Sequence, residues 1–173
     1  MNPKALLLLL LAGCSYRSIG TIIDDNAQEM AIRSRLFANK RINDNSNITV
    51  TMYNGRVLLT GEVRDQQIAT EAVQVVQMNG NVREIRNFLV VGPMSTFSER
   101  SYDAGQTAKI KTALMDIKMR GFNPTNIKVV TEHGTSYLMG IVTRSQAQAV
   151  SDKARQVTGA RSIITLFDLY NGQ

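Results

Sequence analysis

The chain has 173 residues, and without a short leader about 160 remain, enough for one ordinary domain or two very small ones. It contains a single cysteine, so no intramolecular disulfide can stabilise the fold and packed apolar cores must do so. Its 20 basic and 14 acidic residues give a formal net charge of +6, with no run of five like charges that would form a basic arm. This charge indicates an anionic partner without saying which one.

The first fourteen residues have the three-part layout of a secretory signal peptide. Lys4 and the amino terminus supply the positive start, 5–11 form an apolar run, and two small residues precede Cys14. The apolar run is far too short to span a bilayer. The tetrapeptide LAGC at 11–14 resembles the lipobox of bacterial lipoproteins, whose cysteine is acylated, with palmitate among the acyl groups, before the signal is removed.

This resemblance implies a signal peptide at 1–13, lipidation of Cys14 and a lipidated tether at 14–23. In the alternative the signal is cut elsewhere and Cys14 is an incidental free thiol. Several acyl chains together anchor a protein firmly. Ser15 after the cysteine implies, for a Gram-negative lipoprotein, sorting to the outer membrane. Without Lys4, 19 basic and 14 acidic residues remain, so the mature protein is still positively charged. Because such a protein does not meet nucleic acid, anionic lipid headgroups are the expected partners of this positive charge.

One pattern occurs twice in the rest of the chain. Three glycine pairs share an offset of 79 residues, and these are Gly55 and Gly134, Gly61 and Gly140, and Gly80 and Gly159. A period this long is too great for a solenoid, so it predicts two tandem copies of a small domain, at 24–91 and 103–170. The linker expected between them, 92–102, begins with turn-forming residues and lacks periodicity.

A helix is predicted at the start of the first copy. Asp25 is the candidate cap, because a carboxylate there accepts hydrogen bonds from the first free backbone N–H groups. The apolar side chains form a rough inward-facing stripe, and these are Met30, Ile32, Leu36 and Phe37. The helix is expected to end before the polar segment 39–47.

The rest of the first copy is predicted to form two strands, a helix and a third strand. Apolar and polar residues alternate over 48–53, which indicates a half-buried strand. The Asn54-Gly55 pair predicts a tight hairpin turn, because both of its positions need positive φ. The elements expected after this turn are the strand 57–63, a helix begun by Asp65 and ended by Gly80 in the left-handed conformation, and the strand 82–91.

The second copy is predicted to repeat this order. Its expected elements are the helix 106–119, the strand 127–131, the turn 133–134, the strand 137–142, the helix 145–158 and the strand 161–169. Each copy is therefore an αββαβ unit of the α+β class, with a small mixed three-stranded sheet covered on one face by two helices. A unit of about 65 residues has a small core and is expected to be marginally stable unless the two copies pack together.

The order of these segments carries a family resemblance. The sequence VLLTGEV at 57–63, an alanine- and valine-bearing helix, Gly80 and then 82–87 resemble the BON domain, and YLMGIV at 137–142 resembles a more divergent copy. With the lipobox, nearly the whole mature chain is similar to dual BON-domain outer-membrane lipoproteins. The resemblance implies a non-enzymatic protein, lipid-anchored on the periplasmic face of the outer membrane of a Gram-negative bacterium. It also implies that the second BON domain binds anionic phospholipid, and that the protein supports envelope integrity and outer-membrane protein assembly.

In that family the lipid-contacting region centres on the first helix of the second domain and carries an aromatic residue. Here Ala104 or Gly105 stands about where a tryptophan is expected, and Tyr102 is the nearest aromatic.

The outward face of the expected helix 106–119 combines charge with apolar surface. A projection at 100° per residue leaves four such residues outside the core stripe, and these are Lys111, Met115, Lys118 and Met119. We interpret them as phospholipid-binding, since lysines pair with anionic headgroups at roughly 1 kcal/mol each while methionines reach the acyl boundary. In the alternative, Met119 packs under Phe122 and the lysines are ordinary solvent-exposed side chains of the helix.

The residues offer little for catalysis. His133 is the only histidine, and its place in an expected tight turn is explained by a polar side chain that tolerates positive φ. One histidine does not make a transition-metal site, and the Asp24-Asp25 pair is explained by a helix start. We therefore expect no enzyme, no catalytic or metal-binding residue, no cofactor, and neither nucleic acid nor a small-molecule substrate as partner.

Two functions from different classes stay open. In the first the protein is a lipid-binding module. In the second it is an adaptor for the outer-membrane protein assembly machinery that does not bind lipid directly. Unequal copies favour a division of labour, because Thr135-Ser136 replaces Arg56-Val57.

Overall fold

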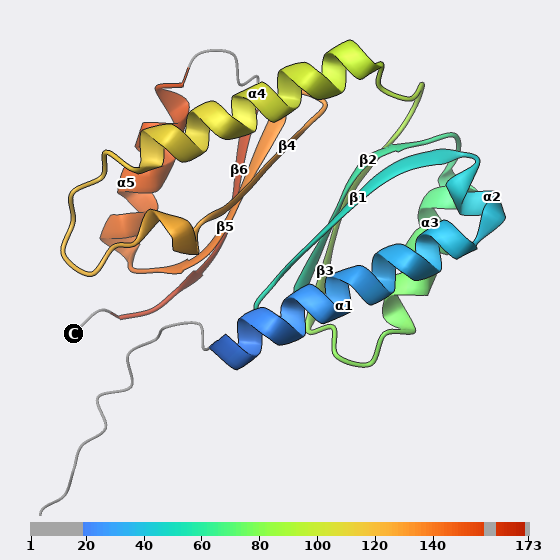
Figure 1. The fold of residues 1–173 in the computed structure, drawn as a ribbon, viewed down its shortest axis with the longest axis horizontal. Coiled ribbons are helices and arrows are strands. Elements are labelled where there is room, and N and C mark those ends of the chain that lie inside the picture. The colour runs from blue at the N-terminus through green and yellow to red at the C-terminus, as the bar shows by residue number, and fades with distance from the viewer. Residues whose placement is uncertain (1–18, 158–161, 172–173) are drawn as a thin grey trace, which may run out of the picture.

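The computed structural model describes residues 19–157 and 162–171. They form two units of the same architecture, each a three-stranded sheet with helices on one face (Figure 1). The predicted signal peptide 1–13, the lipidation site Cys14 and the first part of the tether lie outside the described residues, so these assignments stay predictions.

The two units repeat one order of elements. The first contains α1 (Ile19–Ala38), α2 (Lys40–Asn43), β1 (Ser46–Tyr53), β2 (Arg56–Val63), α3 (Gln66–Gln77) and β3 (Glu84–Val91). The second contains α4 (Phe97–Leu114), the short 3-10 turn η1 (Pro124–Asn126), β4 (Lys128–Glu132), β5 (Thr135–Val142), α5 (Arg144–Arg155) and β6 (Ser162–Leu169). In each sheet the central strand pairs antiparallel with the first strand and parallel with the third. The α+β class and the small mixed sheets are confirmed.

The tight turns predicted between the first two strands of each unit are present. Asn54 and Gly55 have φ values of 51° and 74°, and His133 and Gly134 have 52° and 74°. Asp25, however, does not cap a helix start, because α1 begins six residues before it. Its carboxylate instead accepts hydrogen bonds from the backbone N–H groups of Asn54 (2.6 Å) and Gly55 (2.9 Å).

The inward stripe predicted for α1 is half right. Ile32 and Leu36 are 0% and 5% exposed and belong to the first core, whereas Met30 and Phe37 are 69% and 73% exposed. Two residues along a helix correspond to about 200°, so Met30 cannot share a face with Ile32. The stripe mixed two opposite faces of the helix.

The start of α4 lies inside the segment that was expected to be a linker. Thr96 accepts a hydrogen bond from the N–H of Glu99, and the Glu99 carboxylate accepts from the N–H of Thr96. This capping box begins the helix at Phe97 rather than near Gln106.

Helix α3 begins as predicted and ends differently. Asp65 caps it by accepting from the N–H of Ile68 at 2.9 Å. The helix closes with bonds from Met78 N to Gln74 O and from Asn79 N to Val76 O, and Gly80 does not have positive φ. The left-handed cap assigned to Gly80 is therefore wrong.

The two units pack together through the sheet faces that their helices leave open. Figure 1 shows the sheets facing each other, with α1 and α3 outside one sheet and α4 and α5 outside the other. A separate apolar cluster fills this contact, formed by Tyr53 and Leu58 with Tyr137 and Met139. The structure thus has two helix-covered cores and a third core that both units share.

Candidate functional site

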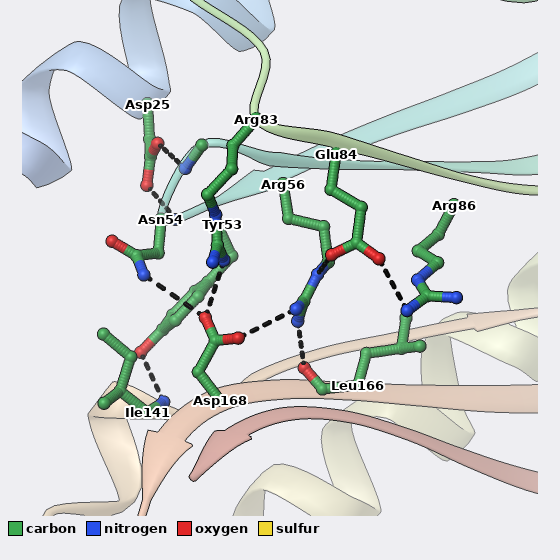
Figure 2. A network of polar contacts seen from close by, with 11 residues as sticks. Asp25, Tyr53, Asn54, Arg56, Arg83, Glu84, Arg86, Ile141, Leu166 and Asp168 are labelled. Atoms are coloured by element: carbon green, nitrogen blue, oxygen red, sulfur yellow. Dashed lines mark hydrogen bonds and ion pairs between the residues drawn. The ribbon is translucent and has the colours of Figure 1, made fainter. Parts of the chain in front are cut away.

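Arg56 is the central polar side chain of the contact between the units (Figure 2). Its guanidinium donates from Nε to Glu84 on the neighbouring strand. Its terminal nitrogens donate to Leu166 O and Asp168 Oδ1 of the second unit, each at 2.8 Å. The Arg56 side chain is only 9% exposed, so these ion pairs are largely withdrawn from water. Because its partners lie on strands, Arg56 fixes how β3 and β6 sit against each other.

Asp168 is the matching acidic group of the second unit. It also accepts from Arg83 (2.8 Å) and from the side-chain amide of Asn54 (3.2 Å). Burial alone would raise the pKa of Asp168, but the bond from Asn54 and the charges of Arg56 and Arg83 outweigh it, so the pKa is lowered. The bond from Arg56 likewise lowers the pKa of Glu84. Both carboxylates are therefore held ionised.

A second polar group lies elsewhere in the same contact. Thr49 Oγ1 donates to Glu132 Oε1 at 2.6 Å, and burial raises the pKa of Glu132. Glu62, 1% exposed, accepts from Ser95 and lies 3.4 Å from Nδ1 of His133. The histidine thus has the turn position expected of it, and it also faces a carboxylate of the other unit.

A cavity of about 360 Å³ opens where α1, α4 and η1 meet. Its lining residues are Asn26, Tyr53, Lys111, Met115, Pro124, Thr125, Ile127 and Lys128. Two of the four residues expected to bind phospholipid, Lys111 and Met115, therefore lie together on its wall. Asn26 brings the first turns of α1 to the same wall, which the sequence projection of α4 alone did not anticipate.

The two lysines of this cavity differ in their partners. Lys128 donates to Glu29 (2.8 Å) and to Met52 O (3.0 Å), so its charge is neutralised within the protein. Lys111 is exposed and, among the residues that the structure describes, forms no ion pair. The cavity therefore offers one uncompensated ammonium group beside Met115, which is 56% exposed.

Lys118 and Met119 do not lie on the helix on which they were expected. Helix α4 ends at Leu114, and successive bonds from Met115 N to Thr112 O and from Asp116 N to Ala113 O tighten the chain into its last turn. Lys118 then donates from Nζ to the carbonyl of Met115 at 3.3 Å. Met119 is half-buried in the following turn. A projection that continued the helix to residue 119 could not reveal this end.

The contact between the units was not predicted, although the sequence carries a signal for it. β2 and β5 are buried along both faces, and each contains an uninterrupted apolar run, Val57-Leu58-Leu59 and Tyr137-Leu138-Met139. Such runs are typical of strands covered on both sides rather than on one. No comparable sequence signal predicted that Arg56 would join the two units, apart from the threonine, Thr135, that replaces it in the second copy.

Two searches limited to the described residues bear on function. Within 19–157 and 162–171, no group of three or more histidine, cysteine, aspartate or glutamate side chains could hold a metal ion. Over the same part of the chain, every helix is too short or too polar to cross a membrane.

Comparison with known proteins identifies similar sequences over most of the chain. The model of the BON domain matches residues 24–93 and 102–169. The chain is 32% identical over 152 residues to the outer membrane lipoprotein DolP of Haemophilus influenzae, covering 87% of this chain and 77% of that protein. It is 30% identical over 155 residues to a 21 kDa hemolysin of Actinobacillus pleuropneumoniae, covering 88% and 77%.

Among solved structures, CdsD, a structural protein of the type III secretion system of Chlamydia trachomatis, is similar over 86% of this chain and 92% of its own. Its TM-score of 0.34 and 14% identity carry no argument about function.

Proposed function

Because the chain belongs to the BON-domain family and is a dual-BON protein of the DolP type, we propose that it is a lipid-anchored protein of the periplasmic face of the outer membrane. In this proposal acylated Cys14 attaches it, its second BON domain binds anionic phospholipid, and it maintains outer-membrane integrity without enzymatic activity. The lipobox at 11–14 supports the anchor, and the similar protein of Haemophilus influenzae carries the name outer membrane lipoprotein.

The observation that carries the lipid proposal is the position of Lys111. This exposed lysine has no ion-pair partner among the described residues and shares a cavity wall with Met115 and with Asn26 of α1. Helix α1 begins five residues after Cys14, so the wall belongs to the part of the molecule nearest the anchor. An ammonium group there contributes roughly 1 kcal/mol to contact with an anionic leaflet.

The test is co-sedimentation of a soluble form that begins at Ser15, and so lacks Cys14, with phosphatidylglycerol vesicles, compared with phosphatidylcholine vesicles. Charge reversal in Lys111→Glu exchanges attraction for repulsion, a change of about 2 kcal/mol, and is expected to weaken binding roughly tenfold or more. Lys109→Glu is the matched control, because Lys109 lies on the opposite side of α4. Undiminished binding by Lys111→Glu together with Met115→Asp would remove this face from the proposal.

A second candidate function is that of an adaptor for the outer-membrane protein assembly machinery, and the outer edge of β1 favours it. Ser46, Ile48 and Val50 line a separate cavity of about 400 Å³. In the antiparallel pairing with β2 these residues direct their backbone groups away from the sheet, as Met52 does. Glu29 accepts from Met52 N, whereas the outward groups of Ile48 and Val50 have no hydrogen bond among the described residues.

An extended segment of another protein can pair with such a strand edge. An adaptor is expected to show no preference for phosphatidylglycerol over phosphatidylcholine vesicles, and to capture a peptide from the assembly machinery in a way that Val50→Pro abolishes. In the intact cell, either function predicts that deletion sensitises the outer membrane to detergent and large antibiotics.

A further inference from the structure

Helix α1 carries large apolar side chains on the face that its own core does not use. Ile23, Met30 and Phe37 are 61%, 69% and 73% exposed. They are spaced by seven residues, and because a straight helix drifts only about 20° per seven residues they form one stripe, roughly 21 Å long. The stripe lies opposite the buried Ile32 and Leu36. A surface helix normally presents polar residues there, so the stripe needs a partner.

The distance to the anchor indicates which partner this is. Helix α1 begins five positions after Cys14, and an extended chain of five steps reaches at most about 18 Å. An acylated Cys14 therefore keeps the first turns of the helix, with Ile22 and Ile23, close to the lipid headgroups. This step rests on the proposed function, since it takes the lipid anchor as given.

The stripe is also continuous with the proposed lipid-contact wall. Asn26 lies three residues after Ile23 and four before Met30, so it neighbours both on the helix surface. The same Asn26 lines one cavity with Lys111 and Met115 of α4. Arg33 lies exposed on the flank of the stripe, where it pairs with Glu29 at 4.0 Å, so this flank is polar while the stripe itself is apolar.

We propose that α1 is a second membrane-contact element, whose stripe of Ile23, Met30 and Phe37 enters the headgroup and acyl boundary of the bilayer that Lys111 and Met115 also meet. The first BON domain then sets the orientation of the whole protein on the membrane, while the second supplies charge recognition. Apolar insertion adds a contact that salt does not screen.

The absence of tryptophan from the sequence allows a direct test. The variants Met30→Trp, Met115→Trp and Met78→Trp each carry one fluorophore at an exposed methionine. Met78 is the matched control, because it is 76% exposed and adjoins Asn79, which bonds Arg35 and Gln28 on the other flank of α1. Each mature chain is coupled through Cys14, its only cysteine, to a maleimide lipid in phosphatidylethanolamine and phosphatidylglycerol vesicles that contain brominated acyl chains.

The expected result is a blue shift and loss of most of the emission for Met30→Trp, with no change for Met78→Trp. Met115→Trp reports the proposed function separately, because the coupling holds every variant at the membrane whatever its own affinity. Quenching at 115 but not at 30 overturns the inference and leaves the proposed function standing. Quenching at 30 but not at 115 supports the contact by α1 and removes the wall of Lys111 and Met115 from the proposed function. A blue shift of Met30→Trp in solution that grows with protein concentration assigns the stripe to a second copy of the chain and overturns the inference.

Discussion

The two BON domains share the residues that form the fold. Each has a two-residue turn with nearly identical φ values, and each has an aspartate from the first helix that binds the turn, Asp25 in the first domain and Asp103 in the second. Each also has a glycine at the same place in its central strand, Gly61 and Gly140. These shared positions are what two copies need in order to fold alike.

The domains differ in the residues that their central strands direct at each other. In β2 these are Arg56, Leu58, Thr60 and Glu62, and in β5 they are Thr135, Tyr137, Met139 and Ile141. The central strand of the first domain thus directs two charged residues, Arg56 and Glu62, at the contact and that of the second directs none, although all four residues of β2 are buried. Buried charges require partners, and Arg56 finds two of its partners in the other domain. Two similar domains have become complementary rather than interchangeable.

The strongest way to break this complementarity is to remove the arginine. Arg56→Ala leaves Glu84 and Asp168 partly buried without their main cation and is expected to cost about 3 to 5 kcal/mol in the free energy of unfolding. Thr135→Ala, at the equivalent position of the second domain, removes no ion pair and is expected to cost less than about 1 kcal/mol. Urea unfolding of both variants measures the difference. Equal losses would mean that the contact does not depend on Arg56.

The next test compares alanine substitutions at the equivalent glycines of the two domains, Gly61 and Gly140. A Cβ at Gly61 would lie 1.9 Å from the backbone oxygen of Asn47, at a φ of +104°. Strain and overlap together predict a loss of about 3 kcal/mol or more for Gly61→Ala. At Gly140 the nearest atom is the side-chain end of Ile127, at 2.6 Å, which can rotate away. Thermal unfolding should show a loss of only about 1 kcal/mol for Gly140→Ala, and a larger loss there than at Gly61 contradicts this account.

The two hairpin turns were predictable from sequence because each reflects a local requirement of the backbone, positive φ at both of its residues. The end of α4 was not, because it depends on which neighbours the helix meets, whereas the exposure of Met30 follows from helical spacing and was missed because the predicted stripe combined two faces of α1. The capping box of Thr96 and Glu99 is recognisable in the sequence, but it was not predicted because a linker was expected there. Of the candidate site, Lys111 and Met115 were found from helical spacing, whereas Asn26 was not, since the packing of two domains brings it there.

The two aspartates that bind the turns offer a smaller test. Asp25 accepts from two backbone N–H groups at 2.6 and 2.9 Å, whereas both oxygens of Asp103 share the N–H of Gly134 at 3.2 and 3.4 Å. Asp25→Ala is therefore expected to cost about 2 to 3 kcal/mol, and Asp103→Ala about 1 kcal/mol. Hydrogen exchange at the turn amides reports the loss at each turn separately. A reversed order would show that distance does not measure the strength of these contacts.

The smallest expected effect concerns two acids of the second domain whose pKa values move in opposite directions. Asp168 has a lowered pKa, so its stabilising contribution is complete above the ordinary value of 3.8 and is lost as the pH falls through the lowered one. Glu132 has a raised pKa, so its contribution is complete below the ordinary value of 4.5 and is lost as the pH rises through the raised one. At neutral pH the first acid supports the domain contact and the second weakens it.

Glu132→Gln should therefore stabilise the protein at neutral pH, by up to about 1 kcal/mol, because the amide oxygen can still accept from Thr49 without carrying a buried charge. Below pH 4.5 the gain should vanish, since Glu132 is then protonated in both the folded and the unfolded state. Asp168→Asn should instead destabilise both at neutral pH and near pH 4, and it should approach the parent protein only where the pH falls through the lowered pKa of Asp168. Urea unfolding at neutral pH and near pH 4 distinguishes them, and a gain from Glu132→Gln that persists in acid would come from packing. Because Glu132 costs stability when it is charged, mild acidification should stabilise the contact between the domains before Asp168 begins to lose its charge.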